Sequence, residues 1–340
     1  MVVQNTGRLS GEAMNDFLSA QRSLAIGFPN PNGDATQSLK GKTLLVTGGA
    51  SGLGESFVKA FAEHPGTAVI IADLNSDRGE ELAKTLNSGE CAAKFIQVDV
   101  TNWDSVTELF RMALTWLRTL DNKRTIDHVV CSAGVESEEL DLTPENPDDF
   151  LERNAPTKPP KSLSINVSVI GSLYTVSAAM KYGLGLHLSD SEKSDKSITL
   201  LSSLAGYSGM SLRSDYTASK WGVRGLFRSL LDDAKSASCP VRVNLVAPYF
   251  VPTPLTAHRV PQLQQIGIKF AALEDVQAAV LRFMSDESVH GRAVGIWQGG
   301  PVDLGDDLGG EFGSAALRKG IEDGALVRGS AHVSKRRERL

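Results

Sequence analysis

Short apolar runs rich in valine and isoleucine alternate with amphipathic segments of helical length from Thr43 to Gly299. Such alternation is typical of repeated strand–helix–strand units, which form a parallel sheet covered by helices on both faces. We expect seven strands, at Leu44–Thr47, Ala68–Ala72, Phe95–Val98, His128–Ser132, Ile198–Ser202, Val241–Val246 and Ala293–Trp297. Because one alternation runs through all of them, the sequence predicts a single doubly wound α/β Rossmann domain with a seven-stranded parallel sheet.

The chain has 340 residues, a length that ordinarily suggests about two domains. The continuous alternation instead favours one domain at residues 41–302, with an N-terminal extension at 1–40 and a C-terminal tail at 303–340. Two inserts interrupt the pattern. Asp141–Lys161 combines prolines with acidic residues, and Lys181–Lys196 is rich in serine and charge, so we expect solvated loops there.

The charge balance excludes several classes of partner. Forty acidic side chains against 35 basic ones give a formal net charge of −5, which leaves no overall positive field for nucleic acid or an anionic membrane surface. No uninterrupted apolar run reaches the about 20 residues of a membrane-spanning helix, and the N-terminal residues do not resemble a secretory signal. We therefore expect a cytoplasmic protein without nucleic-acid or membrane partners.

Cysteine and histidine are too scattered to indicate a metal centre. The three cysteines, Cys91, Cys131 and Cys239, form no CxxC motif, and none of the six histidines belongs to an HExxH motif. The odd number of cysteines also argues against a disulfide framework. The sequence predicts a reducing environment and no metal.

A glycine-rich turn, Thr47-Gly48-Gly49-Ala50-Ser51-Gly52-Leu53-Gly54, directly follows the first expected strand and precedes a helical stretch. Glycines at this position let the backbone approach a pyrophosphate, and the N–H groups at the start of the helix stabilise its negative charge. The alternative interpretation is a tight connection without a ligand.

Asp73 ends the second expected strand, 19 residues beyond Gly54. A Rossmann unit places at this spacing the carboxylate that accepts hydrogen bonds from the adenosine ribose. The same carboxylate would repel a 2′-phosphate, and no Lys or Arg stands at Ser51 or directly after Asp73 to pair with one. These features favour NAD over NADP as the cofactor. The alternative is that Asp73 only caps the next helix.

A second motif, Tyr216-Thr217-Ala218-Ser219-Lys220, lies within the amphipathic stretch Leu212–Ala234. Residues four apart share one face of a helix, so the Tyr216 phenol and the Lys220 ammonium can address the same molecule. A nearby cation can lower the pKa of a phenol, which ordinarily is about 10. Ser203 lies thirteen residues before Tyr216, at the end of the fifth expected strand, where doubly wound sheets bind ligands. Alone, the Tyr and Lys would indicate only a solvated helix face.

With these motifs the sequence resembles the short-chain dehydrogenase/reductase family, of the single-domain type, from about Lys42 to Gly300. TGGASGLG matches the family's TGxxxGxG, YTASK matches its YxxxK, and Ser203 has the usual serine spacing. The resemblance implies four catalytic residues: Asn166, Ser203, Tyr216 and Lys220. Asn166, in INVSVIGSLY, would hold a water that connects Lys220 to solvent.

The resemblance also implies a set of residues that contact the dinucleotide. Asp99 would lie beside the adenine, and Thr253 would contact the nicotinamide carboxamide. The full set is Gly48, Ser51, Gly52, Leu53, Gly54, Asp73, Asp99, Val100, Ala133, Gly134, Tyr216, Lys220, Pro248, Val251 and Thr253.

Two segments depart from the family pattern. Cys131-Ser132-Ala133-Gly134 stands where the family has NNAG, so side-chain amides that tie the strands together are missing. Tyr249 follows Pro248 where the family has glycine. Tyr249 either narrows the pocket and stacks on a flat substrate or is an exposed loop residue.

These features together predict an NAD-dependent oxidoreductase that interconverts a secondary alcohol and a ketone. Tyr216 would be the general base in oxidation, Ser203 would polarise the substrate oxygen, and Lys220 would lower the pKa of Tyr216 and bind the nicotinamide ribose. Oxidation is the expected direction, because cells keep NAD oxidised. Two alternatives stay open, a non-redox catalyst such as a cyclase and a protein that senses the dinucleotide without turnover, although the presence of all four catalytic residue types argues against both.

The loops expected around the substrate, Val135–Glu138, Leu204–Met210 and Tyr249–Ile268, are mostly apolar. They favour a bulky apolar small-molecule substrate. The chain is similar in character to 15-hydroxyprostaglandin dehydrogenase-like members and to fungal enzymes of secondary metabolism, which implies a polyketide-, terpenoid- or lipid-like alcohol. The resemblance also implies a homodimer or homotetramer that packs through the helices around Val167–Lys181 and Leu212–Ala234.

Overall fold

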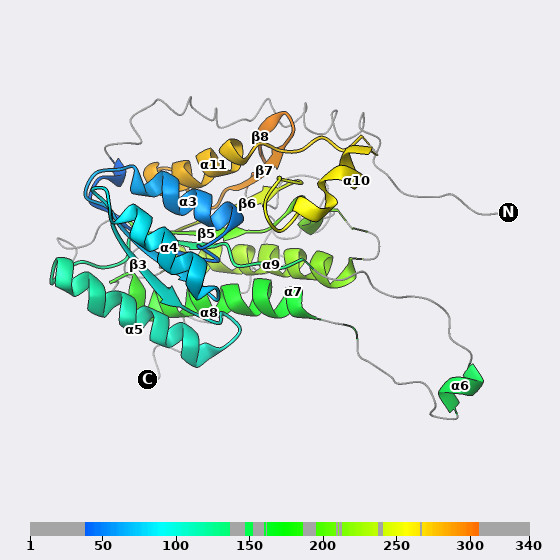
Figure 1. Ribbon diagram of the computed structural model, residues 1–340, viewed down its shortest axis with the longest axis horizontal. Helices are drawn as coiled ribbons and strands as arrows, with labels where there is room; N and C mark the ends of the chain where they lie inside the picture. Colours follow the sequence, from blue (N-terminus) through cyan, green and yellow to red (C-terminus); the bar gives the residue numbers. More distant parts are fainter. Residues whose placement is uncertain are drawn as a thin grey trace, which may run out of the picture.

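The computed structural model of the chain describes residues 38–136, 147–151, 160, 162–185, 195–208, 210, 213–236, 241–265 and 267–305. Their strands form one sheet with the order β3-β2-β1-β4-β5-β6-β7-β8 (Figure 1). The strands are β1 (Thr43–Thr47), β2 (Ala68–Asp73), β3 (Ala92–Gln97), β4 (His128–Cys131), β5 (Ser197–Leu201), β6 (Arg242–Pro248), β7 (Ala293–Trp297) and β8 (Gly300–Asp303). The first seven are parallel, which confirms the predicted doubly wound architecture.

Helices cover both faces of the sheet (Figure 1). One face packs against α3 (Gly52–Ala62), α4 (Ser76–Leu86) and α11 (Leu273–Ser285). The other face packs against α5 (Trp103–Leu120), α8 (Gly171–Ala178) and α9 (Ser214–Ser236). Shorter helical segments are α6 (Pro147–Leu151), α7 (Leu163–Ile165), α10 (Val260–Gln265), η2 (Asn166–Ile170), η3 (Ala179–Gly183), η5 (Leu204–Gly206) and η6 (Ala257–Arg259).

Two apolar clusters, one on each face of the sheet, explain why the strands are continuous apolar runs. Leu45 in β1 packs into the cluster beneath α5, α8 and α9, whereas its neighbours Leu44 and Val46 pack into the cluster beneath α3, α4 and α11. All three side chains are fully buried. A strand covered on both faces requires apolar residues at every position, not at alternate ones.

The structure contains an eighth strand that the sequence did not predict. β8 pairs antiparallel with β7, and Gly300, opposite Trp297, has a φ of 99°. Its composition, with Gly300 and Pro301, is typical of a turn. Proline is nevertheless tolerated in an edge strand, because one side of that strand needs no partner. The prediction of a purely parallel seven-stranded sheet was therefore wrong at this edge.

Packing continues slightly beyond the predicted domain of residues 41–302. Leu39 is fully buried, and Asp303 and Leu304 are also buried. Most of the predicted N-terminal extension and C-terminal tail lies outside the described residues, as do parts of both predicted loops.

The strand order reverses between β1 and β4, and this reversal positions the site. At such a point the connections leave toward opposite faces of the sheet and open a crevice at the carboxyl ends of the strands. The glycine-rich turn follows β1, and residues 132–136 follow β4. Both segments therefore lie at the crevice.

One helical run, Leu163–Gly183, is long and apolar enough to cross a membrane, by length and composition only. It packs against β4, α5 and α9, as the core helix of a globular domain does. Its side chains Leu173 and Tyr182 are exposed, as is Trp221 on α9. These are the two helices expected to pack against a second copy of the chain, and that homo-oligomer stays a prediction.

A buried ion pair joins the amino ends of three strands. The Lys196 ammonium, just before β5, donates to Asp127 Oδ1 at 2.8 Å, to Thr125 Oγ1 at 2.8 Å and to the carbonyl oxygen of Ile126 at 2.9 Å. Asp127 Oδ2 accepts from the backbone N–H of Thr43 at 2.8 Å. Every donor of the ammonium has a partner, which offsets the cost of burying its charge.

We predict that Lys196→Met lowers the free energy of unfolding by about 3–5 kcal/mol, because the Asp127 carboxylate would stay buried without its cation. Lys59→Met is the matched control: Lys59 pairs with Glu55 on the surface of α3, and such pairs contribute at most about 1 kcal/mol. Urea denaturation measures both values. Equal losses in the two variants would contradict the prediction.

Candidate active site

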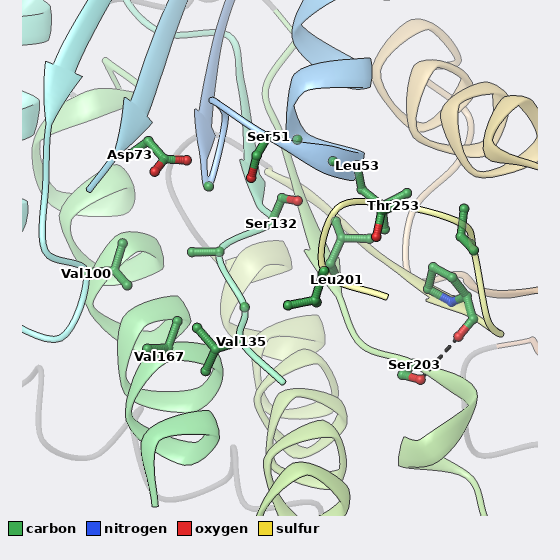
Figure 2. A pocket seen from close by; sticks show the side chains of 18 of the residues that line it. Ser51, Leu53, Asp73, Val100, Ser132, Val135, Val167, Leu201, Ser203 and Thr253 are labelled. Atoms are coloured by element: carbon green, nitrogen blue, oxygen red, sulfur yellow. Dashed lines mark hydrogen bonds between the residues drawn. The ribbon is translucent and has the colours of Figure 1, made fainter. Parts of the chain in front are cut away.

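A cavity of about 360 Å³ lies at the carboxyl ends of the strands (Figure 2). Every residue that was predicted to contact the dinucleotide lines it, and so does Ser203. Tyr216 and Lys220, which belong to both predicted sets, line it as well. Asn166 is the exception, since it does not line the cavity.

The turn after β1 approaches its surroundings so closely that side chains are excluded. Gly48 has a φ of 68°, and a Cβ there would lie 2.7 Å from Cα of Ala133 in the loop after β4. A Cβ on Gly54 would lie 2.0 Å from the carbonyl oxygen of Gly48. Glycine is therefore required at both positions, and the turn presents main-chain atoms to the cavity.

The start of α3 provides the anion-binding part of this surface. Ser51 precedes the helix in extended conformation, and its side chain makes no capping hydrogen bond. The N–H groups of the first turn can therefore donate to a ligand, and the positive end of the helix dipole adds to the attraction. Figure 2 shows Ser51 and Leu53 at the edge of the cavity. This arrangement fits a dinucleotide pyrophosphate.

Asp73 lies at the end of β2, on the other side of the cavity from Ser203 (Figure 2). Its Oδ2 accepts from the backbone N–H of Ala50 at 3.0 Å, and its Oδ1 accepts from that of Asn75 at 3.0 Å. Asn75, not Asp73, caps α4, because its side-chain oxygen accepts from the N–H of Arg78. The Asp73 carboxylate retains further lone pairs for a ribose diol, so the helix-cap alternative is not what the structure shows.

Tyr216, Lys220 and Ser203 meet at the far end of the cavity. The first two lie one turn apart on α9, and Lys220 Nζ is 5.4 Å from the centroid of the Tyr216 ring. Ser203 follows β5, and its hydroxyl donates to the carbonyl oxygen of Pro248 at 3.2 Å (Figure 2). The phenol, the ammonium and the hydroxyl thus line the same cavity as the Asp73 carboxylate.

The shift in the pKa of Tyr216 is opposite in direction to the expected one. Burial raises the pKa of the Tyr216 phenol above its ordinary value, and the hydrogen bond with Ser203 opposes this rise. Burial also lowers the pKa of Lys220 to about 8. Lys220 is not among the causes of the shift, and burial of the phenol outweighs the causes that lower its pKa, so the expected net lowering is not found.

Asn166 is exposed, whereas Ser168 two residues later is buried on the side of Lys220. A Cβ on Gly134 would lie 3.6 Å from Lys220 Nζ and 3.7 Å from Ser168 Oγ, so these polar atoms flank one point. Within the described part of the chain, Ser168 Oγ has no hydrogen-bond partner. The structure therefore places Ser168 where Asn166 was expected.

Helical spacing explains the difference. Ser164 and Ser168 are four residues apart and lie on the buried face, where the Ser164 hydroxyl donates to the carbonyl oxygen of Val135 at 3.3 Å. Asn166 is two residues from each and points to the other side. A stripe of small polar residues at this spacing, continued by Ser172, is the sequence signal that could have identified Ser168.

The two departures from the family pattern leave the site intact. The N–H of Ser132 donates to the carbonyl oxygen of Thr47 at 3.1 Å, so main-chain bonding connects the strands here. Tyr249 lines the cavity and packs against Trp297 and Phe250, with ring centroids 4.5 Å and 4.9 Å away. It is a wall residue rather than an exposed loop residue.

No three His, Cys, Asp or Glu side chains among the described residues lie close enough together to hold a metal ion.

The geometry defines a dinucleotide-dependent dehydrogenase, and comparison with known proteins agrees. The chain belongs to the short-chain dehydrogenase/reductase family, because the family model described as short chain dehydrogenase matches residues 42–264. It is accordingly an NAD(P)-dependent enzyme that acts on CH–OH groups.

Two curated relatives and one solved structure are similar to this chain. The 5'-hydroxyaverantin dehydrogenase of Dothistroma septosporum is 38% identical over 79% of this chain and 89% of its own. The NADP-dependent dehydrogenase M3 of a Phoma species is 32% identical over 75% of this chain and 74% of its own. A short-chain type dehydrogenase/reductase from Mycobacterium marinum, 23% identical over 77% of this chain and 96% of its own, shares the fold with a TM-score of 0.61.

We predict that Ser168→Ala lowers the turnover number about tenfold, because a hydrogen bond near a charged group contributes about 1.5–3 kcal/mol. Asn166→Ala is the matched control on the same helix and should leave turnover unchanged, since Asn166 is exposed and outside the cavity. Steady-state kinetics at saturating dinucleotide measure both. A larger loss of turnover in Asn166→Ala than in Ser168→Ala would contradict the prediction and assign the water-binding role to Asn166.

Proposed function

We propose that this enzyme oxidises a secondary alcohol on a bulky, largely apolar substrate, with NAD as its preferred cofactor. The observation that carries the proposal is the shared cavity, which has Asp73 at one end and Tyr216, Ser203 and Lys220 at the other. A dinucleotide that spans it would bring its reactive ring beside the phenol.

The preference for NAD rests on the charges that line the cavity. Lys220 is the one basic side chain among the described lining residues, and it lies at the catalytic end. Asp73 at the ribose end would repel a 2′-phosphate, and no lining cation there would pair with it. NADP is the second candidate, because the Phoma relative carries NADP in its name.

The apolar character of the substrate rests on the wall of the cavity. Val135, Val167, Tyr249 and Leu255 line it with apolar or aromatic surface. Such a wall favours a ligand that buries hydrocarbon or ring surface. The name of the Dothistroma relative, which specifies a hydroxylated metabolite as its substrate, supports the same class.

Each residue at the catalytic end has a chemical task. The dinucleotide, when bound, supplies the hydride acceptor. Ser203 donates to the substrate oxygen and orients it, while Tyr216 takes the hydroxyl proton. Lys220 holds positive charge beside the phenol and can donate to the ribose hydroxyls. Ser168 lies where it can hold a water next to Lys220, so that the proton can leave toward solvent. Reduction of a ketone uses the same groups in reverse.

A non-redox catalyst or a dinucleotide sensor would not need this arrangement. Neither requires a phenol, a hydroxyl and a lysine to converge next to the ring-binding end of the cavity. The appearance of reduced nicotinamide absorbance with a panel of apolar secondary alcohols would support the dehydrogenase. Tight dinucleotide binding without any such absorbance would favour the alternatives.

We predict that Tyr216→Phe reduces alcohol oxidation at least about 1,000-fold, because it removes the general base. The affinity for NAD should change less than about threefold, since the phenol contributes one of many contacts. Tyr249→Phe, in the same cavity, is a control that should retain most of its turnover. Substantial turnover by Tyr216→Phe would contradict the assigned role.

We predict that Asp73→Ser weakens NAD binding about tenfold and improves NADP binding, because the variant loses the ribose acceptor and the repulsion of the 2′-phosphate together. Quenching of tryptophan fluorescence measures both affinities. Asp77→Ser, on the first turn of α4, should leave the NAD to NADP ratio unchanged. A wild-type preference for NADP would refute the assignment of Asp73.

A further inference from the structure

A cluster of charged side chains lies behind the loops that flank the cavity, and three of its four members belong to loops that were expected to be mostly apolar. Glu136, in the loop after β4, stands at its centre. Its Oε1 lies 2.6 Å from a guanidinium nitrogen of Arg259 and 3.1 Å from one of Arg213. Its Oε2 lies 3.4 Å from Nε2 of His258. We call these four residues the Glu136 cluster.

The Glu136 cluster joins three segments that are far apart in the sequence. Glu136 follows β4, Arg213 immediately precedes α9, and Arg259 ends η6 in the long connection after β6. The side chains of these three residues are only 17%, 11% and 19% exposed, whereas His258 is 66% exposed. Solvent and salt screen the attraction in such a shielded contact less than in a surface ion pair.

The position of the cluster relates it to the substrate. The connection after β6 lines the cavity from Tyr249 to Thr256 and then continues into η6, where Arg259 anchors it. The Arg259 guanidinium also lies 5.6 Å from the ring centroid of Phe250, in the same connection. Arg213 stands three residues before Tyr216, at the start of the helix that carries the phenol.

We propose that Glu136 is a positioning residue that holds the connection after β6 against the first turn of α9 and so shapes the substrate side of the cavity beside Tyr216. The proposal rests on the proposed function, because it concerns the binding of the substrate that Tyr216 deprotonates. Two arginines contact one carboxylate oxygen. Without the carboxylate, two shielded cations would face each other, and their repulsion would move the connection away.

The charges of the cluster also act on the phenol. Tyr216 faces Lys220 from its own helix, Ser203 from the segment after β5, Glu136 from the loop after β4 and Arg259 from η6. After burial and the Ser203 hydrogen bond, the Glu136 carboxylate raises the pKa of Tyr216 and the Arg259 guanidinium lowers it. The two members of one ion pair therefore have opposite effects on the same proton.

Other groups near the phenol complete this electrostatic environment. Asp215 accepts a hydrogen bond from the backbone N–H of Tyr216 at 2.7 Å. Arg213 and His258 contact Glu136. The substitutions below leave all three unchanged, so that a shift in the pH profile reports the Glu136 and Arg259 charges.

The test compares Glu136→Gln, Arg259→Gln and the double variant in alcohol oxidation. We expect Glu136→Gln to raise the KM for the substrate about tenfold with NAD affinity unchanged, because the dinucleotide contacts lie elsewhere. The double variant should recover part of this loss, since it removes one of the two facing cations. The acid limb of the pH profile should move about half a unit to lower pH in Glu136→Gln and to higher pH in Arg259→Gln.

The sign of these shifts follows from charge. Oxidation needs the phenolate, so removing a negative neighbour makes deprotonation easier and removing a positive one makes it harder. Shifts of both variants in the same direction, or an unchanged KM in Glu136→Gln, would overturn the proposal. Glu108→Gln, which breaks an exposed pair with Arg111 on α5, is the control and should match the wild type. A wild type without alcohol oxidation would refute the proposed function instead.

Discussion

The close approach of two backbones at the point where the strand order reverses is the constraint on which the site depends. Gly48 packs against the backbone of Ala133, and Gly54 packs against the carbonyl oxygen of Gly48, each with no room for a Cβ. This contact lets α3 begin directly at the turn, so its free N–H groups face the cavity. The covered sheet makes the arrangement rigid, because every residue of β1 is buried. The turn and the start of α3 thus present main-chain atoms to the cavity.

Burial has different consequences at the two ends of the cavity. At one end, the Asp73 carboxylate lines the cavity while main-chain N–H groups orient it. At the catalytic end, burial raises the pKa of Tyr216 and lowers that of Lys220 to about 8. Burial disfavours the charged form of both groups, so the two pKa values move apart, with that of the phenol above that of the amine. The Glu136 cluster adds charges of both signs beside the same phenol.

How far the sequence predicted the structure depended on whether a feature was local. The strand periodicity and the glycine-rich turn are local, and so are Asp73 and the Tyr216 to Lys220 spacing, because a strand end or one helical turn fixes them. The expected position of Asn166 was not found, because the elements that pack against a helix decide which of its faces is buried. Ser168 occupies the buried face. β8 was not predicted, because it forms a strand by pairing with β7 and its own residues are typical of a turn. The contact between Glu136 and Arg259 spans 123 positions, which no spacing rule can anticipate.

Hydrogen exchange of the backbone amides, with and without saturating NAD, tests the central claim most directly. If the pyrophosphate binds to the main chain at the start of α3, exchange should slow at Gly52, Leu53 and Gly54 and in the loop from Pro248 to Thr253. The backbone amides of α5 should exchange at the same rates with and without NAD. NAD binding that leaves the amides of Gly52 to Gly54 unprotected would contradict the account.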